Sequence, residues 1–266
     1  MKTLNLFILS FLIIAASSNA QNQRNIASKP FKEKKPTIVF VHGLWSDGSC
    51  WNDVISVLQT EGYPVISTQN PTSSFEDDVA ATKKVLDRTQ GAVILVGHSW
   101  GGFVITEVGN DPRVEGLVYV AGFAPDAGES PVDLLAMAAP NNLNNYFQIN
   151  NGFITLSKDG IKNAFAGDLS SKQQIQLYAT QTPASQSVFT AKNILPAWKS
   201  KPSWYIVAKN DSAINPDLQR LLSKRIKAIT LEVESSHVVM ISKPMEVLMM
   251  IREAAGHKYE KNYSQR

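Results

Sequence analysis

Runs of apolar, β-branched residues recur along the chain, and a stretch with helical periodicity follows most of them. The two strongest runs are 37–41 and 92–96, and continuous apolar runs of this length are typical of strands buried on both faces of a sheet. Further strands are predicted at 63–68, 114–121, 202–208 and 228–233, and helices at 47–59, 75–89, 100–109, 216–224 and 244–255. Repeated β-α-β units of this kind predict an α/β domain with a mostly parallel, doubly wound sheet and helices on both faces.

One long segment, 125–196, interrupts this alternation because it contains no convincing buried strand. Short helices are predicted within it at 132–138 and 171–180. A loop is predicted around Asn141, Asn142, Asn144 and Asn145. We therefore expect a small helical cap inserted between two core strands of a single domain, 37–256, which is followed by a polar tail, 257–266. A domain of this length is ordinary for an α/β fold.

The first 20 residues are predicted to be a signal peptide. Lys2 supplies the positive charge, 4–16 is apolar, and Ser18 and Ala20 are small residues at a cleavage site. A retained anchor is the alternative, but the apolar run is shorter than the roughly 20 residues that a membrane-spanning helix needs. We expect export to a periplasm or the exterior, a linker over 21–36, and no membrane association after cleavage.

Charge and cysteine content exclude several classes of protein. The formal net charge is +3, and removal of the predicted signal peptide, which holds one lysine and no acid, leaves +2. This charge is too weak to indicate nucleic-acid binding. Cys50 is the only cysteine, so no internal disulfide can form, and we expect a buried, inert thiol. The oligomeric state has no signature in the sequence.

The pattern Gly97-x-Ser99-x-Gly101 lies between a predicted buried strand and a predicted helix. In that context the pattern predicts a sharp strand-to-helix turn that exposes the Ser99 hydroxyl at the edge of the sheet. The residues two positions either side must be small, because side chains there would collide. The N-terminus of the following helix would add a partial positive charge beside the serine. Ser99 is therefore the candidate nucleophile.

A serine hydroxyl needs a base, and the chain has four histidines. His98 is inside the turn, with its side chain expected to point away from Ser99. His42 is expected to brace its loop, and His257 lies in the predicted polar tail. His237 follows the last predicted strand, where a loop can reach back over the sheet edge. His237 is therefore the candidate base.

A serine nucleophile and a histidine base usually work with a third residue, an acid, which should hold the imidazole in the correct tautomer. Asp211 follows the strand at 202–208 and lies between Ser99 and His237 in the sequence. This matches the chain order of serine, acid and histidine that accompanies a serine in such a strand-to-helix turn. Three rivals stay open, namely Asp217, Glu234 and Asp126. Asp211 is preferred on chain order and on its position after a core strand.

A serine nucleophile also needs amide groups that stabilise the negative oxygen of the intermediate. The amide of Trp100 is one expected donor. The other is expected after the first strand, at Leu44 or, alternatively, at Trp45, with Gly43 allowing a close approach of the backbone. The sequence shows no paired metal ligands and no Gly-rich nucleotide motif, so neither a metal nor another cofactor is predicted.

Three segments carry a resemblance to a known family: 41–51, 97–102 and 236–244. On these segments, the chain resembles the α/β-hydrolase superfamily over nearly all of 37–256. Within it, the chain resembles bacterial exported α/β-hydrolases and the plant methylesterase and hydroxynitrile lyase group. The resemblance implies the α/β-hydrolase fold, a cap over the pocket, and small carboxylic esters as substrates.

Two departures from the pattern bear on the chemistry. The lyases of this group have a lysine directly after the catalytic histidine, where this chain has Val238. Dehalogenases and epoxide hydrolases have aspartate at the position of Ser99. The leading hypothesis is therefore a serine esterase that forms an acyl-enzyme. The alternatives are a ligand receptor or carrier with slow turnover, and cofactor-free cleavage of a carbon–carbon bond or a lyase reaction.

Substrate identity is not readable from the sequence beyond a modest hydrophobic group. Several aromatic side chains could line a pocket or fill the core, and the core is the default expectation for each. They are Trp45, Trp51, Phe123, Phe147, Phe153 and Trp198.

Overall fold

Six strands form a single parallel sheet in the computed structural model, in the order β2-β1-β3-β4-β8-β9. The structure describes residues 34–263, with side chains for 34–256. The strands are β1 (Thr37–Val41), β2 (Val65–Ser67), β3 (Val93–His98), β4 (Val114–Val120), β8 (Ser203–Ala208) and β9 (Ile229–Val233). The predicted parallel sheet and its strand positions are confirmed.

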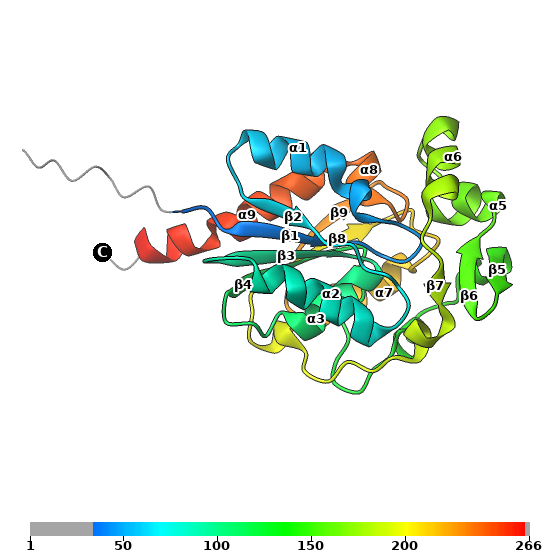
Figure 1. Ribbon diagram of the computed structural model, residues 1–266, viewed down its shortest axis with the longest axis horizontal. Helices are drawn as coiled ribbons and strands as arrows, with labels where there is room; N and C mark the ends of the chain where they lie inside the picture. Colours follow the sequence, from blue (N-terminus) through cyan, green and yellow to red (C-terminus); the bar gives the residue numbers. More distant parts are fainter. Residues whose placement is uncertain (1–33, 264–266) are drawn as a thin grey trace, which may run out of the picture. The chain divides into compact units, whose positions relative to one another are not determined.

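Helices cover both faces of this sheet (Figure 1). One face carries α1 (Asn52–Thr60) and α9 (Pro244–Tyr263), and the other carries α2 (Phe75–Asp87) and α3 (Trp100–Val108). The short α8 (Val239–Ser242) precedes α9, and α7 (Pro216–Arg225) connects β8 to β9. The last helix is longer than expected, because α9 continues from the predicted end at residue 255 to Tyr263 and takes in part of the predicted polar tail.

The central strands are buried, as their continuous apolar sequences predict. Every residue of β1, β3 and β8 is buried. Trp51 is fully buried and packs on Phe40, with 4.7 Å between ring centroids, so it belongs to the core as expected. Cys50 is also buried, and burial raises the pKa of its thiol to about 12. The expected burial of the thiol is confirmed, and a raised pKa disfavours the reactive thiolate.

The cap lies between β4 and β8 in the chain and beyond the carboxyl ends of the core strands (Figure 1). Its helical elements are α4 (Pro131–Leu135), the turn η2 (Leu143–Tyr146), α5 (Lys158–Gly160), the π-helical η3 (Ile161–Phe165), α6 (Ser171–Thr180), η4 (Gln186–Thr190) and η5 (Ala197–Lys199). The predicted helix 171–180 coincides with α6, whose N-terminus carries a capping box of Ser170 and Gln173.

The expectation of a purely helical cap is wrong in one respect. The cap also contains an antiparallel sheet of β5 (Phe147–Asn150), β6 (Phe153–Leu156) and β7 (Ala184–Ser185). These strands are only two to four residues long, and β5 is largely exposed. They therefore lack the apolar runs that mark a buried strand. The turn between β5 and β6 is Asn151-Gly152, with φ of 48° and 81°. An Asn-Gly pair of this kind is the local signal for a hairpin.

The predicted signal peptide and most of the predicted linker lie outside the described residues. Within the part that the structure describes, no helix combines the length and the apolar character needed to cross a membrane.

Candidate active site

Ser99 sits in a strained turn between β3 and α3, with φ of 53° and ψ of −120°. Positive φ is costly for a residue other than glycine and persists only where the surroundings impose it. The glycines around Ser99 make the turn possible. A Cβ on Gly97 would lie 2.5 Å from the carbonyl oxygen of Gly101, and a Cβ on Gly101 would overlap the carbonyl oxygen of Val41. The predicted turn at Ser99 is confirmed.

Hydrogen bonds to neighbouring strands hold the turn. The Ser99 amide donates to the carbonyl of Val120 at 3.1 Å, and the Ser99 carbonyl accepts from the amide of Phe123 at 3.1 Å. The next residue, Trp100, is fixed through its indole Nε1, which donates to Oδ2 of buried Asp78 at 2.7 Å. These contacts fix the main chain around the serine, so its Cβ keeps one position relative to the sheet edge.

His237 meets Asp211, the acid that the sequence favoured. Nδ1 of His237 lies 2.7 Å from Oδ2 of Asp211, and the side chains are 1% and 0% exposed, respectively. A carboxylate can only accept, so Nδ1 carries the proton when the imidazole is neutral. That tautomer leaves Nε2 of His237 free to accept a proton from another group.

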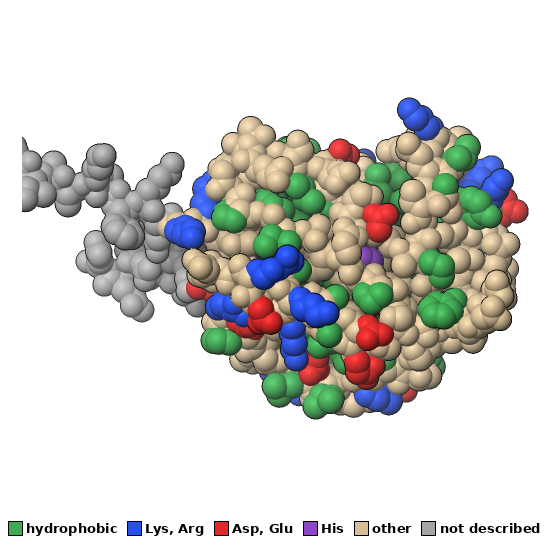
Figure 2. Space-filling view, viewed as in Figure 1, with side chains coloured by type: hydrophobic (Ala, Val, Ile, Leu, Met, Phe, Trp, Pro, Cys, Tyr) green, Lys and Arg blue, Asp and Glu red, His purple; other side chains and the backbone are tan. Residues whose placement is uncertain are grey.

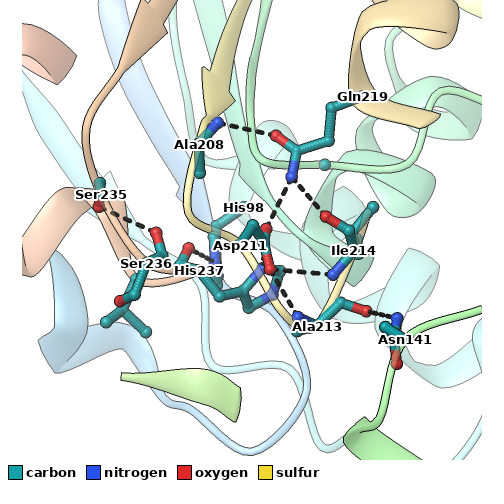
Figure 3. Close-up of polar contacts among 12 residues, drawn as sticks. His98, Asn141, Ala208, Asp211, Ala213, Ile214, Gln219, Ser235, Ser236 and His237 are labelled. Atoms are coloured by element: carbon teal, nitrogen blue, oxygen red, sulfur yellow. Dashed lines mark hydrogen bonds and ion pairs between the residues drawn. The ribbon is translucent and has the colours of Figure 1, made fainter. Parts of the chain in front are cut away.

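The Asp211 carboxylate accepts hydrogen bonds from two backbone amides and one further side chain (Figure 3). Oδ1 accepts from the amides of Ala213 and Ile214, at 2.7 and 2.9 Å. Oδ2 accepts from Nε2 of Gln219 at 2.7 Å, and the Gln219 Oε1 accepts from the amide of Ala208 at 2.9 Å. These bonds fix the carboxylate, so that it presents Oδ2 to His237.

Sequence reasoning missed Gln219, which is fully buried on α7. Glutamine is mostly exposed in proteins, and the burial of Gln219 is visible only in the structure. The three rival acids are elsewhere. Asp217 pairs with Arg220, Asp126 with Lys199, and Glu234 with Lys209.

His98 contacts His237, the candidate base. Its Nε2 lies 3.0 Å from the carbonyl oxygen of His237, and the two rings are 4.6 Å apart between centroids. Burial lowers the pKa of His98 well below its usual value, so the ring is neutral and Nε2–H donates. His42 braces its loop as predicted. Its Nδ1 donates to the carbonyl of Gly43 at 2.9 Å, and its Nε2 accepts from the amide of Asn70 at 3.0 Å.

The predicted oxyanion donors lie close to Ser99. A Cβ on Gly43 would come within 2.7 Å of the Ser99 Cβ, so the loop after β1 passes directly beside the serine. In the described part of the chain, no turn or loop hydrogen bond uses the amide of Leu44, Trp45 or Trp100. The amide of Trp100 begins α3, where backbone N–H groups have no intrahelical acceptor. The structure therefore leaves all three candidate amides available.

Ser99 and His237 line the same cavity, of about 130 Å³, beneath the cap. Its walls come from the loop after β1, from the cap and from the loop after β8, and include Leu44, Trp45, Phe123, Phe147, Phe189 and Ile214. Among the described residues, the cavity has no lysine, arginine, aspartate or glutamate in its lining. On the face seen in Figure 2, a small spot of histidine is visible between the surrounding side chains, although the histidines at 42, 98 and 237 are buried.

Of the aromatic residues that the sequence singled out, Trp45, Phe123 and Phe147 line this cavity, and Trp45 and Phe123 also belong to the buried core, as expected. Phe153 is exposed on the cap, and the Trp198 indole donates to the carbonyl of Pro125 at 2.7 Å. Across residues 34–256, no cluster of three or more histidine, cysteine or acidic side chains is placed to bind a metal ion.

The sequence profile of the alpha/beta hydrolase family matches residues 38–249. The chain belongs to this family. This hydrolase is 25% identical over 250 residues to an alpha/beta hydrolase, nvfD, of Aspergillus novofumigatus. The match covers 85% of this chain and 99% of the relative. It is 35% identical over 123 residues to a carbendazim hydrolyzing esterase of a Nocardioides species, a match that covers 41% of this chain and 51% of that esterase.

Among solved structures, this hydrolase is similar to a pyrethroid hydrolase of Sphingobium faniae. The TM-score is 0.72 at 21% sequence identity, and the match covers 85% of this chain and 99% of that one. This likeness shows a shared fold. The family match makes the protein an α/β hydrolase, and its similarity to an esterase and a pyrethroid hydrolase makes it similar to carboxylic ester hydrolases.

Proposed function

We propose that this protein hydrolyses small, uncharged carboxylic esters through an acyl-enzyme on Ser99. The observation that carries the proposal is that His237, which lines the same cavity as Ser99, forms a buried pair with Asp211 at 2.7 Å. An imidazole in this tautomer can take the proton from a serine hydroxyl and then stabilise its own positive charge against the carboxylate. The names of the esterase relatives support the same chemistry.

In the proposed reaction, Oγ of Ser99 attacks the ester carbonyl carbon while Nε2 of His237 takes the hydroxyl proton. The carbonyl oxygen becomes an oxyanion, held by the amides of Trp100 and Leu44 or Trp45. Each such donor is worth roughly 2.7–4 kcal/mol in the transition state. The intermediate collapses, the C–O bond to the alcohol breaks, and His237 returns the proton to the leaving alkoxide. The acyl group stays on Ser99.

Water then attacks the acyl-enzyme, again giving its proton to His237. Collapse of the second intermediate releases the carboxylic acid and regenerates the Ser99 hydroxyl. Every step uses only a proton, a nucleophile and backbone dipoles, so the residues already described account for the whole cycle.

The substrate class follows from the lining of the cavity. Apolar and aromatic side chains surround Ser99, and the polar groups among them are uncharged amides, including Asn141 and Asn144. A charged substituent buried there would lose its hydration without gaining a partner. We therefore propose neutral esters with a small apolar group.

The test is hydrolysis of p-nitrophenyl acetate by the wild-type protein and by Ser99→Ala, with exposed Ser49→Ala as the matched control. The proposal expects steady turnover in the wild type and the control, and none above background in Ser99→Ala. One equivalent of product followed by near-zero turnover would instead favour the slow ligand-binding alternative. Retained turnover in Ser99→Ala would refute the proposal.

We also propose that the protein is exported and that residues 1–20 are removed, on the strength of the N-terminal sequence alone. Expression of the full chain, followed by mass measurement of the protein from the periplasm and medium, tests this. A mature N-terminus at Gln21 is expected, and a full-length protein retained in the membrane would contradict it.

A further inference from the structure

The histidine loop, which we define as residues 234–238, follows a strand that gives it little support. β9 is the edge strand of the sheet, and four of its five residues are not buried. Catalysis needs the imidazole within a fraction of an ångström of its working position. The position of His237 must therefore be fixed by contacts that the loop itself makes.

Three of those contacts lie within the core domain, and one of the three joins two residues of the loop itself. The carbonyl of Ser235 accepts from the amide of Asn210 at 3.1 Å. The carbonyl of Ser236 accepts from the Ser235 hydroxyl at 2.9 Å, and the carbonyl of His237 accepts from His98 at 3.0 Å. These bonds, two of which appear in Figure 3, satisfy carbonyl oxygens. None of these three bonds involves the amide of buried Ser236, which therefore needs another acceptor.

That acceptor comes from the cap. Oδ2 of Asp168 accepts from the Ser236 amide at 2.9 Å, and Oδ1 accepts from the Ser236 hydroxyl. Three residues earlier, Phe165 is fully buried and packs on the imidazole of His237, with 5.2 Å between ring centroids. One short cap segment, 165–168, thus contacts both the ring of His237 and the main chain directly before it.

The cap is built so that this segment keeps its shape. The Gln174 side chain on α6 donates through Nε2 to the carbonyls of Ala166 and Leu169, at 2.9 and 3.1 Å. The capping box of Ser170 and Gln173 fixes the start of α6 directly after it. The carboxylate of Asp168 is therefore presented from a braced turn. Burial raises its pKa, but hydrogen bonds from Ser236 outweigh that and lower it, so Asp168 is ionised near neutral pH.

We infer that Phe165 and Asp168 are positioning residues for His237, so that the cap completes the catalytic geometry as well as covering the substrate. This inference rests on the proposed role of His237 as the base. The hydrogen bonds from Ser236 to a carboxylate are charge-assisted, and such bonds are about twice as strong as neutral ones. Losing the acceptor would leave a buried N–H unpaired and free the residue next to the imidazole to move.

The test compares Asp168→Ala with Asp159→Asn, which changes an exposed cap carboxylate in the first turn of α5. The first readout is kcat and KM for p-nitrophenyl acetate. The second is the rate at which an alkyl fluorophosphonate modifies Ser99, a reaction in which the serine oxygen bonds to phosphorus, fluoride leaves and His237 takes the proton. The labelling rate reports activation of Ser99 without requiring ester turnover.

We expect Asp168→Ala to lower kcat and the labelling rate together, by about 10-fold or more, with KM changed less than about two-fold. Asp168→Asn should be intermediate, because its Oδ1 still accepts from the Ser236 amide. Phe165→Ala should also lower both rates, whereas the exposed Phe153→Ala on the same cap should not. Thermal melting checks that each variant is folded, and if Asp168→Ala is not, the comparison uses Asp168→Asn.

Rates for Asp168→Ala within two-fold of those for Asp159→Asn, or a change in KM alone, would overturn the inference while leaving the proposed function intact. A wild-type protein that neither turns over the ester nor reacts with the fluorophosphonate would instead overturn the proposed function, and with it this inference. The two failures are therefore distinguishable.

Discussion

Nδ1 of His237 and Oδ2 of Asp211 lie 2.7 Å apart in a pair of side chains that solvent barely reaches. The carboxylate accepts three further N–H groups besides that of His237. It is therefore a rigid acceptor, and its main effect on the imidazole is to fix one tautomer and one orientation.

Asp211→Asn should abolish most activity while leaving the fold in place. The asparagine amide would present a donor to Nδ1 of His237, which forces the proton onto Nε2 and removes the base. We expect kcat for p-nitrophenyl acetate to fall by about 10³- to 10⁴-fold. Asp217→Asn, at an exposed position paired with Arg220, should stay within two-fold of the wild type. Equal kcat values for the two variants would contradict the assignment of Asp211.

Gln219→Leu should weaken both stability and activity. The change leaves the buried amide of Ala208 without its acceptor and removes one donor from Asp211. Each buried group left unpaired costs about 1–3 kcal/mol, so the free energy of unfolding in urea should fall by about 2–4 kcal/mol. Gln176→Leu, on the exposed face of α6, is the control. A Gln219→Leu variant as stable and active as that control would show that the network is dispensable.

A charge on the substrate should be rejected. p-Nitrophenyl butyrate and mono-p-nitrophenyl succinate have similar size, but the second carries a carboxylate. Because no cationic side chain among residues 34–256 lines the cavity, kcat/KM for the succinate ester should be lower by about 100-fold or more. Comparable kcat/KM values would mean that the acyl group binds outside this cavity.

Much of the fold and the site could be predicted from the sequence because the signals are local. Continuous apolar runs mark strands such as β1 and β3, whose every residue is buried. The glycines around Ser99 mark its turn, since the backbone there leaves no room for a side chain. Chain order then selected Asp211 and His237, which the structure brings together.

The rest depends on tertiary contacts that leave little local trace. Gln219 reaches Asp211 from the next helix, and Asp168 reaches Ser236 across 68 residues of sequence. Neither residue belongs to a motif. The cap strands escaped prediction because they are short and partly exposed, so alternation of polar and apolar residues has little length over which to show. The Asn151-Gly152 turn was the one local signal for them.

Two glycines in helices offer a matched test of the turn at Ser99. A Cβ on Gly101 would overlap the carbonyl oxygen of Val41, whereas a Cβ on Gly256 would meet nothing within 4 Å. Gly→Ala in an open helix position stabilises by about 0.5–1 kcal/mol. We expect Gly256→Ala to raise Tm slightly, and Gly101→Ala to lower Tm and abolish ester hydrolysis. An active, fully stable Gly101→Ala would contradict the described packing of α3 on β1.

Asp78 should make stability depend on pH in a defined window. Burial is the largest cause that raises its pKa, from 3.8 to about 6. Between these values the folded state holds a proton that the unfolded state has lost, so this group's contribution to stability falls as pH rises from about 4 to 6. The loss should reach roughly 1–3 kcal/mol. The measurement is the unfolding free energy of wild type minus that of Asp78→Asn across this range, and a flat or rising difference would be inconsistent with a raised pKa.

If His237 and Asp211 activate Ser99 as proposed, its hydroxyl should react far faster than any other in residues 34–256. The most direct measurement is mass spectrometry of the wild type, Ser99→Ala and His237→Ala after reaction with an alkyl fluorophosphonate. We expect one adduct per wild-type chain, on the peptide that contains Ser99, no adduct in Ser99→Ala, and strongly slowed labelling in His237→Ala. An unmodified wild type, or labelling of Ser99→Ala at the same rate, would contradict it.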